Sequence, residues 1–142
     1  MAVDKSPAVS ARGATKSFGQ LRVLDGLDVD IPRGVTYCLL GPNGSGKTTF
    51  IRAIVRLIRL DAGELRVLGL PVSEVDRIYP RIGYMTQHKA LYPDLTVEEN
   101  MEFYSGLYGI KGQDRENRIE ELLRMVTLAE HRKRLAGALS GG

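Results

Sequence analysis

The sequence predicts an α/β fold, and three features carry that prediction. Two runs with strand character open the chain, a glycine-rich loop lies between a short apolar run and a helical pattern, and helical patterns fill the chain from about residue 93 onward. The chain has 142 residues, of which 43% are hydrophobic and 26% charged. That composition is typical of a globular protein large enough to bury its own core.

Two antiparallel strands are expected at the beginning of the chain. Residues 14–18 and residues 21–31 are separated by Gly19 and Gln20, which suit a tight turn. In part of the second run apolar and polar residues alternate, as they do in a strand with one buried face. The sequence therefore predicts a β lead-in before the rest of the fold.

A buried strand and a helix are expected on either side of the glycine-rich loop. Residues 35–40, VTYCLL, are apolar and partly β-branched, and the run is short enough for a strand. Cys38 is expected to be a small buried hydrophobe within it. A helix is expected over residues 47–60, with an apolar face formed by Phe50, Ile51, Ile54, Val55 and Ile58.

The remaining pattern predicts short strands followed by helices. Strands are expected at residues 64–68 and 81–87, with turns at residues 61–63 and at Gly69. Thr96 and Glu99 have the spacing of a capping box, which marks the start of a helix. A later helix has an apolar stripe at Ile119, Leu122, Leu123 and Val126. We therefore expect a first part over residues 1–92 and a helical subdomain over residues 93–142.

The glycine-rich loop predicts a site for a nucleoside triphosphate. GPNGSGKTT fits the pattern G-x-x-x-x-G-K-[ST] and lies between an expected strand and an expected helix. Its glycines let backbone N–H groups face inward around an anion, and the helix adds its positive end. Lys47 can reach the terminal phosphates, and the Thr48 hydroxyl can bind Mg²⁺. The predicted binding residues are Gly41, Pro42, Asn43, Gly44, Ser45, Gly46, Lys47, Thr48 and Thr49.

Three stretches in order resemble the ATP-binding cassette (ABC) ATPases. Residues 14–49, ATKSFGQLRVLDGLDVDIPRGVTYCLLGPNGSGKTT, are similar to the opening of that family. Gln87, at the end of GYMTQ, resembles its Q-loop, and ALSGG at residues 138–142 resembles its signature motif. The resemblance covers essentially the whole chain. It implies a P-loop NTPase core of the ABC type with an antiparallel β lead-in and a helical subdomain.

The resemblance also implies roles for individual residues. Phe18 would stack on adenine, Lys47 and Gln87 would act in catalysis, and Thr48 and Gln87 would place Mg²⁺ beside ATP. In the family, the signature residues, here Leu139, Ser140, Gly141 and Gly142, contact ATP held by a second, head-to-tail ATP-binding subunit. The motif is cut short in this sequence, and we expect that it does not make this contact here. A membrane-spanning transporter subunit would be the other partner, coupled through the helical segment, and nucleic acid is not an expected partner.

The stretch at residues 91–109, LYPDLTVEENMEFYSGLYG, is similar to ATPase subunits of drug and polyketide exporters of the ABC-2 class. This similarity implies export driven by ATP hydrolysis. It places the ATPase in the cytoplasm, peripheral to the inner face of the cell membrane through the transporter partner.

We expect the chain to be a part of such a subunit that ends before the Walker B strand. The Walker B Asp-Glu pair and the switch histidine follow the signature in this family, and no substitute is found, since Glu130 lacks a preceding Asp and His131 precedes the signature. We expect weak nucleotide binding without hydrolysis by these residues alone. The apolar runs at residues 35–40 and 82–85 should then lack a neighbouring strand and expose a sheet edge.

Composition and charge leave two other readings open. The net charge of +3 is spread along the chain, the single cysteine excludes an intramolecular disulfide, and no apolar run reaches the length of a membrane span. The start of the chain has no apolar segment typical of a secretory signal. The alternatives are a regulatory module that docks on a transporter, and a soluble ABC ATPase of DNA repair or translation. An unrelated P-loop kinase would explain neither Gln87 nor LSGG.

Overall fold

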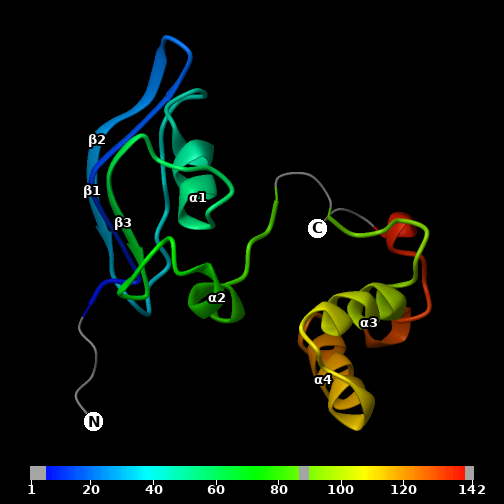
Figure 1. Cartoon of the computed structure of the whole chain (residues 1–142). Helices are drawn as coiled ribbons and strands as arrows, with labels where there is room; N and C mark the ends of the chain where they lie inside the picture. The colour runs from blue at the N-terminus through cyan, green and yellow to red at the C-terminus, as the bar shows by residue number, and fades with distance from the viewer. Residues whose placement is uncertain (1–5, 87–89, 140–142) are drawn as a thin grey trace. The chain divides into compact units, whose positions relative to one another are not determined.

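The computed structural model describes residues 6–86 and 90–139 (Figure 1). It divides the chain into two compact units, Met1–Tyr84 and Met85–Gly142. Each unit has a hydrophobic cluster of its own. The division expected from the sequence, between residues 92 and 93, stays a prediction.

The first unit contains a four-stranded antiparallel sheet with the order β2-β1-β3-β4. Its strands are β1 (Val9–Phe18), β2 (Leu21–Ile31), β3 (Ala62–Val67) and β4 (Leu70–Pro71). The lead-in pair is confirmed: Val9 lies opposite Ile31 and Phe18 opposite Leu21. The turn at Gly69 is also confirmed, since Leu68 and Gly69 both have positive φ, as a two-residue hairpin of type I′ requires.

Helix α1 (Lys47–Ile54) covers one face of this sheet (Figure 1). Phe50 and Ala53 are almost fully buried and pack against side chains of β1, β2 and β3. This contact holds the start of α1, and therefore the glycine-rich loop, against the sheet. The cluster consists of Val9, Ala11, Ala14, Leu24, Phe50, Ala53 and Leu65.

The expected extension of α1 to residue 60 is wrong, because the chain leaves the helix at Arg56. Arg56 has φ of 57°, and its N–H donates to the Ala53 carbonyl. The next N–H, of Leu57, donates to the Arg52 carbonyl. These two bonds are the Schellman pattern, which closes a helix with one residue in the left-handed region. Of the expected apolar face, Ile51 is 39% exposed, while Phe50 and Val55 are buried.

Two expected strands are wrong. Residues 35–40 and 82–86 have no strand structure, and no strand of the described sheet pairs with them. A strand needs a hydrogen-bonded neighbour, so these apolar runs stay open: Leu40 is 87% exposed and Met85 93%. Cys38, expected to be buried, is exposed. Between the sheet and this second run lie α2 (Val75–Ile78) and a 3₁₀ turn, η1 (Tyr79–Arg81).

The second unit is helical, as expected. It contains α3 (Val97–Leu107), α4 (Gly112–Met125) and the 3₁₀ turns η2 (Ala129–His131) and η3 (Ala136–Ala138). The capping box is confirmed, because Glu99 N–H donates to Thr96 Oγ1 and Thr96 N–H donates to Glu99 Oε2. In the expected apolar stripe of α4, Ile119 and Leu123 are buried, whereas Val126 is 52% exposed at the helix end.

Asn100 fastens the loop before α3 to the helix itself. Its side-chain oxygen accepts the Tyr92 N–H at 2.8 Å. Its amide nitrogen lies within 3.3 Å of the carbonyl oxygens of Tyr92, Leu95 and Thr96. Asn100 is 3% exposed and is the buried polar residue of the described chain. A buried amide with all its partners fixes the path of residues 92–96.

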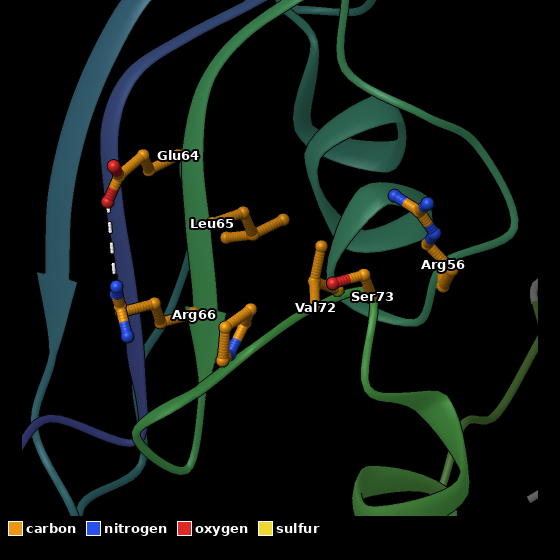
Figure 2. Close-up of a pocket in the computed structure, with 7 residues that line it drawn as sticks. Arg56, Glu64, Leu65, Arg66, Val72 and Ser73 are labelled. Atoms are coloured by element: carbon orange, nitrogen blue, oxygen red, sulfur yellow. Dashed lines mark ion pairs between the residues drawn. The ribbon is translucent and has the colours of Figure 1, made fainter.

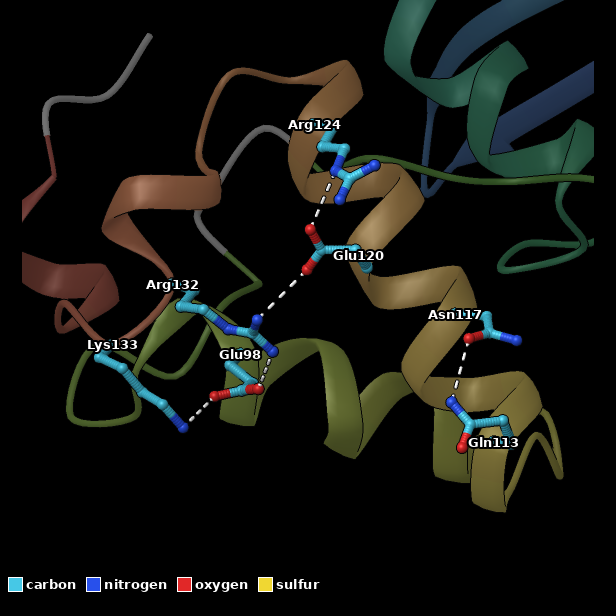
Figure 3. Close-up of polar contacts among 7 residues, drawn as sticks. All are labelled: Glu98, Gln113, Asn117, Glu120, Arg124, Arg132 and Lys133. Carbon is cyan, nitrogen blue, oxygen red and sulfur yellow. Dashed lines mark hydrogen bonds and ion pairs between the residues drawn. The ribbon is translucent and has the colours of Figure 1, made fainter.

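A network of charged side chains fastens the segment after α4 to both helices of this unit (Figure 3). Glu98 of α3 accepts hydrogen bonds from Lys133 and Arg132, and Arg132 also donates to Glu120 of α4 at 3.2 Å. The bonds from Lys133 and then Arg132 hold the pKa of the Glu98 carboxyl below its usual value, so Glu98 is charged near neutrality.

Backbone pairing continues the attachment of this segment. Thr96 forms an isolated antiparallel bridge with Leu135, and Val97 N–H donates to the Arg134 carbonyl at 3.0 Å. Leu139 is partly buried against the cluster of Val97, Ile119 and Leu123. The chain that leads to residue 139 is therefore held in place by α3 and α4.

Candidate functional site

The glycine-rich loop connects the exposed run at residues 35–40 to the first turn of α1. Gly44 and Gly46 have φ of 82° and 87°, a conformation that side-chain-bearing residues rarely adopt. A Cβ at Gly46 would lie 2.8 Å from the Val23 carbonyl oxygen and 2.9 Å from Leu24 Cδ2. Only glycine lets the loop approach β2 this closely, so the sequence determines where the loop lies on the sheet.

Lys47 folds back across the loop. Its Nζ donates to the carbonyl oxygens of Gly41 and Pro42, both at 2.7 Å, and lies 3.3 Å from Ser45 Oγ. The ammonium group is therefore held against the loop by neutral acceptors. A phosphate oxygen is a stronger acceptor, so an anion in the loop could draw the ammonium to itself.

The start of α1 complements this cation. The first turn contains no acidic side chain, and Gly46 provides no side-chain cap. The first N–H groups of any helix have no partner within the helix, so those of α1 are free to face an anion. The Thr48 side chain is exposed beside them. A hydroxyl at this place can bind a hard cation such as Mg²⁺, which prefers oxygen ligands.

A cavity of about 440 Å³ lies beside the loop. Its size falls within the range of small-molecule sites, and its walls combine apolar side chains with the loop backbone. The lining residues are Val23, Leu24, Asp25, Leu27, Leu39, Leu40, Gly41, Pro42, Ser45, Gly46, Lys47 and Phe50.

A second cavity, of about 300 Å³, lies between β3, β4 and the end of α1 (Figure 2). Figure 2 shows Leu65 pointing toward α1, while Glu64 and Arg66 point to the other side of β3, as alternation along a strand requires. Glu64 and Arg66 pair with each other at 3.8 Å. These two charged side chains therefore lie on the side of β3 that faces away from α1 (Figure 2).

The other predicted site residues are placed unevenly. Phe18 lies at the end of β1 and is 51% exposed, so its ring is accessible to a ligand. Leu139 packs on the core of the second unit. Gln87, Ser140, Gly141 and Gly142 lie outside the described residues.

Sequence reasoning missed two charged residues near Phe18. Lys16 lies close to the Phe18 ring and pairs with Asp61 at 2.7 Å. The position of Lys16, two residues before Phe18 on a strand, is a signal that could have identified it, because such residues share a face. Asp61 gave no local signal, since its partners are distant in the sequence.

Within residues 6–86 and 90–139, no group of three or more His, Cys, Asp or Glu side chains could hold a metal ion. None of the helices described in those ranges has both the length and the apolar character needed to cross a bilayer.

Comparisons with known proteins agree on one family. The sequence profile described as "ABC transporter" matches residues 24–142. The daunorubicin resistance ATP-binding protein DrrA3 of Streptomyces coeruleorubidus is 38% identical over 95% of this chain and 43% of its own length. The sulfate/thiosulfate import ATP-binding protein CysA of Salmonella typhi is 39% identical over 89% of this chain and 36% of its own.

A solved structure, described as the ATP-binding subunit of an ABC transporter, has the same fold. Its TM-score is 0.77 at 25% identity, and the match covers 94% of this chain and 56% of the other. The expected fold class is thereby confirmed. The chain spans about two-fifths of the length of the two curated relatives.

Proposed function

The chain belongs to the ABC transporter family, as an ATP-binding domain, and from this we propose that the loop at residues 41–49 binds the phosphates of ATP together with Mg²⁺. The observation that carries the proposal is the position of Lys47. Its ammonium group lies over the loop, on carbonyl acceptors that a phosphate can replace.

The other residues supply complementary interactions. We propose that the first N–H groups of α1 bind phosphate oxygens, that Thr48 and Gln87 bind Mg²⁺, and that Phe18 stacks on adenine. The exposed side chains of Thr48 and Phe18 support two of these roles. Bound Mg²⁺ would offset the negative charge of the phosphates during their transfer, next to Lys47.

Residues outside this chain belong to the proposal for the whole protein. We propose an ATP-binding subunit that pairs head-to-tail with a second one and drives a membrane-spanning partner from the cytoplasmic side. The direction of transport is a separate proposal, because the relatives include a drug-resistance protein and an import protein. We favour export on the similarity of residues 91–109. That these 142 residues alone do not hydrolyse ATP stays a prediction.

The test measures the affinity of the 142-residue chain for Mg·ATP by calorimetry and compares it with the affinities of the Lys47→Ala and Arg59→Ala variants. We expect Lys47→Ala to weaken binding about 10- to 100-fold, the usual effect of losing a hydrogen bond between charged groups. Arg59→Ala removes the same charge from an exposed position of the same unit and should change the affinity little. Equal affinities of Lys47→Ala and the unaltered chain would refute the proposed phosphate site.

A further inference from the structure

The side chain of Lys16 lies against the Phe18 ring. Its Nζ is 5.5 Å from the ring centroid, within the distance at which a cation and an aromatic ring attract each other. This contact places the two side chains on the same side of β1, even though the pairing of β1 with β2 is irregular between Lys16 and Ser17. The Lys16 side chain is only 16% exposed, which is unusual for lysine. Lys16 is thus held in place next to the ring.

Asp61 holds Lys16 there. Its Oδ1 accepts from Lys16 Nζ at 2.7 Å, and its Oδ2 accepts the Ser17 N–H at 2.7 Å. Its own N–H donates to the Thr15 carbonyl at 2.8 Å. The bonds from Lys16 and then Ser17 hold the pKa of the Asp61 carboxyl below its usual value, so it is ionised near neutrality.

The place of Asp61 in the chain links two parts of the proposed ATP site. Asp61 lies between the helix that begins at the phosphate loop and strand β3. Through its bonds to residues 15–17, the segment that joins α1 to β3 is fastened to the end of β1, where Phe18 lies. The strand that carries the ring is therefore tied to the segment that follows α1, the helix of Lys47.

We infer that Lys16, clamped by Asp61, is a positioning residue for nucleotide binding that orients the Phe18 ring for stacking on a purine base. The inference rests on the proposed function. An ammonium group near an aromatic ring draws its π electrons, which favours stacking of the ring on an electron-rich purine. A ring already held in place also loses less freedom when the base binds.

Other charges on the same hairpin do not have this arrangement. Arg22 and Asp25 pair at 3.0 Å, but their side chains are 61% and 74% exposed. An exposed pair of this kind contributes little to structure. Arg22 therefore provides a matched control that removes one positive charge from the same hairpin.

The absence of tryptophan from the sequence allows a direct experiment. Phe18→Trp places a single tryptophan at the proposed stacking position, and its fluorescence should be quenched when a purine stacks on it. In this background, Lys16→Gln, Lys16→Arg and Arg22→Gln are titrated with Mg·ATP. Inorganic tripolyphosphate is titrated in parallel by calorimetry, because it occupies the phosphate loop without a base.

We expect Lys16→Gln to weaken ATP binding about two- to fivefold, as the loss of one cation–aromatic contact implies, and to reduce the quenching at saturation. The affinity of Lys16→Gln for tripolyphosphate should not change. Lys16→Arg should restore the quenching, and Arg22→Gln should bind ATP like the Phe18→Trp variant in which all three substitutions are made. Unchanged ATP binding and quenching in Lys16→Gln would overturn the inference. An equal loss for ATP and tripolyphosphate would also overturn it, because Lys16 would then act on the phosphates or on the fold.

The proposed function fails in a different way. If ATP does not quench the fluorescence of the Phe18→Trp variant but still binds in a way that depends on Lys47, stacking on residue 18 is refuted. The proposed phosphate site is then unaffected. If the unaltered chain binds neither ATP nor tripolyphosphate, the phosphate site itself is refuted.

Discussion

Each of the two units is stabilised internally by a different kind of interaction. The first unit buries a continuous apolar cluster between a sheet and α1, with Phe50 at 2% exposure. Among the described residues of the second unit, Val97, Ile119 and Leu123 form the buried centre of a smaller cluster. This unit adds a buried amide, a capping box and a charged network to fix its loops. Apolar burial therefore positions the phosphate loop, whereas directional polar bonds position the segment that leads to residue 139.

This difference matters for function because the two kinds of interaction respond differently to change. Apolar packing is short-ranged and not directional, and the screening of charges by salt does not weaken it. Hydrogen bonds to buried polar groups depend on the identity of single atoms, since an unmatched donor or acceptor is costly. We therefore expect the stability of the first unit to depend mainly on the volume of its buried side chains. The stability of the second should depend mainly on single hydrogen-bonding atoms.

The largest effect should come from Phe50→Ala in the first unit. Removing a fully buried phenylalanine typically costs about 3–5 kcal/mol, because transfer free energy is lost and a cavity remains. Hydrogen exchange of peptides from β1 to β3, measured by mass spectrometry, should show loss of protection throughout that unit. The second unit should keep its protection, because the described cluster that contains Phe50 consists of residues of the first unit.

Phe103→Ala is the control for this comparison. Phe103 lies on α3 and is 41% exposed. Its ring meets the Tyr92 ring edge to face, with the two ring centroids 4.9 Å apart. Its removal should lower protection much less than Phe50→Ala does in its own unit. Similar losses for the two variants would mean that burial does not distinguish the units as proposed.

The second largest effect should come from Asn100→Asp in the second unit. The substitution keeps the shape but replaces an amide donor by an oxygen that faces the carbonyl oxygens of Tyr92, Leu95 and Thr96. Burying an unmatched polar or charged atom costs about 2–3 kcal/mol or more. We expect exchange of residues 92–107 to accelerate at pH 7.

The dependence on pH supplies the check. A carboxyl at this buried position should have a raised pKa, since burial disfavours its charged form, and its protonated form can donate one hydrogen bond. Protection in Asn100→Asp should therefore recover in part as the pH falls toward 5. Loss of protection that is independent of pH would mean that charge is not the cause.

Local sequence patterns predicted the elements that depend on neighbours in sequence. The turn at Gly19 and Gln20, the capping box of Thr96 and Glu99, and the burial of Phe50 were all predicted and are confirmed. Each depends on residues within a few positions of one another. The glycine-rich loop belongs to the same class, because its backbone conformation is set by its own glycines.

Features that depend on distant partners were predicted poorly. The lack of a neighbouring strand beside residues 35–40 was expected, but the strand itself and the burial of Cys38 were predicted wrongly, since the run is irregular and Cys38 is exposed. The contact of Lys16 with Asp61 spans 45 positions and gave no local signal. The fold of Lys47 onto the Gly41 and Pro42 carbonyls also follows from the three-dimensional course of the loop.

Helix ends are a third class of feature. The two units differ less in how their helices end than in how their cores are built. Helices α1 and α4 both end in a Schellman pattern with a non-glycine residue at positive φ, Arg56 in the first and Thr127 in the second. Helix α3 ends in the same pattern with Gly109. Glycine, which is the usual residue at this position, therefore occurs at only one of these three helix ends.

The smallest effect, and one of opposite sign, should come from Thr127→Gly. A β-branched residue at φ of 56° is strained, whereas glycine adopts this conformation freely. Relief of strain is offset in part by the greater freedom of glycine in the unfolded chain, so we expect a gain of about 0.5–1 kcal/mol. Urea unfolding followed by circular dichroism, with slower exchange of residues 112–128, would measure it.

Gly109→Ala is the mirror variant at the end of α3. Gly109 has φ of 73° and open space around its Cα, so an added methyl group meets no neighbour and only the backbone is strained. It should lower stability by about 1 kcal/mol, while Thr127→Ala, which keeps a Cβ at positive φ, should gain less than Thr127→Gly. A loss of stability in Thr127→Gly would show that the Thr127 side chain contributes more than its backbone strain costs. The sensitivity of the second unit to the identity of single atoms would then include its helix ends as well as its buried amide.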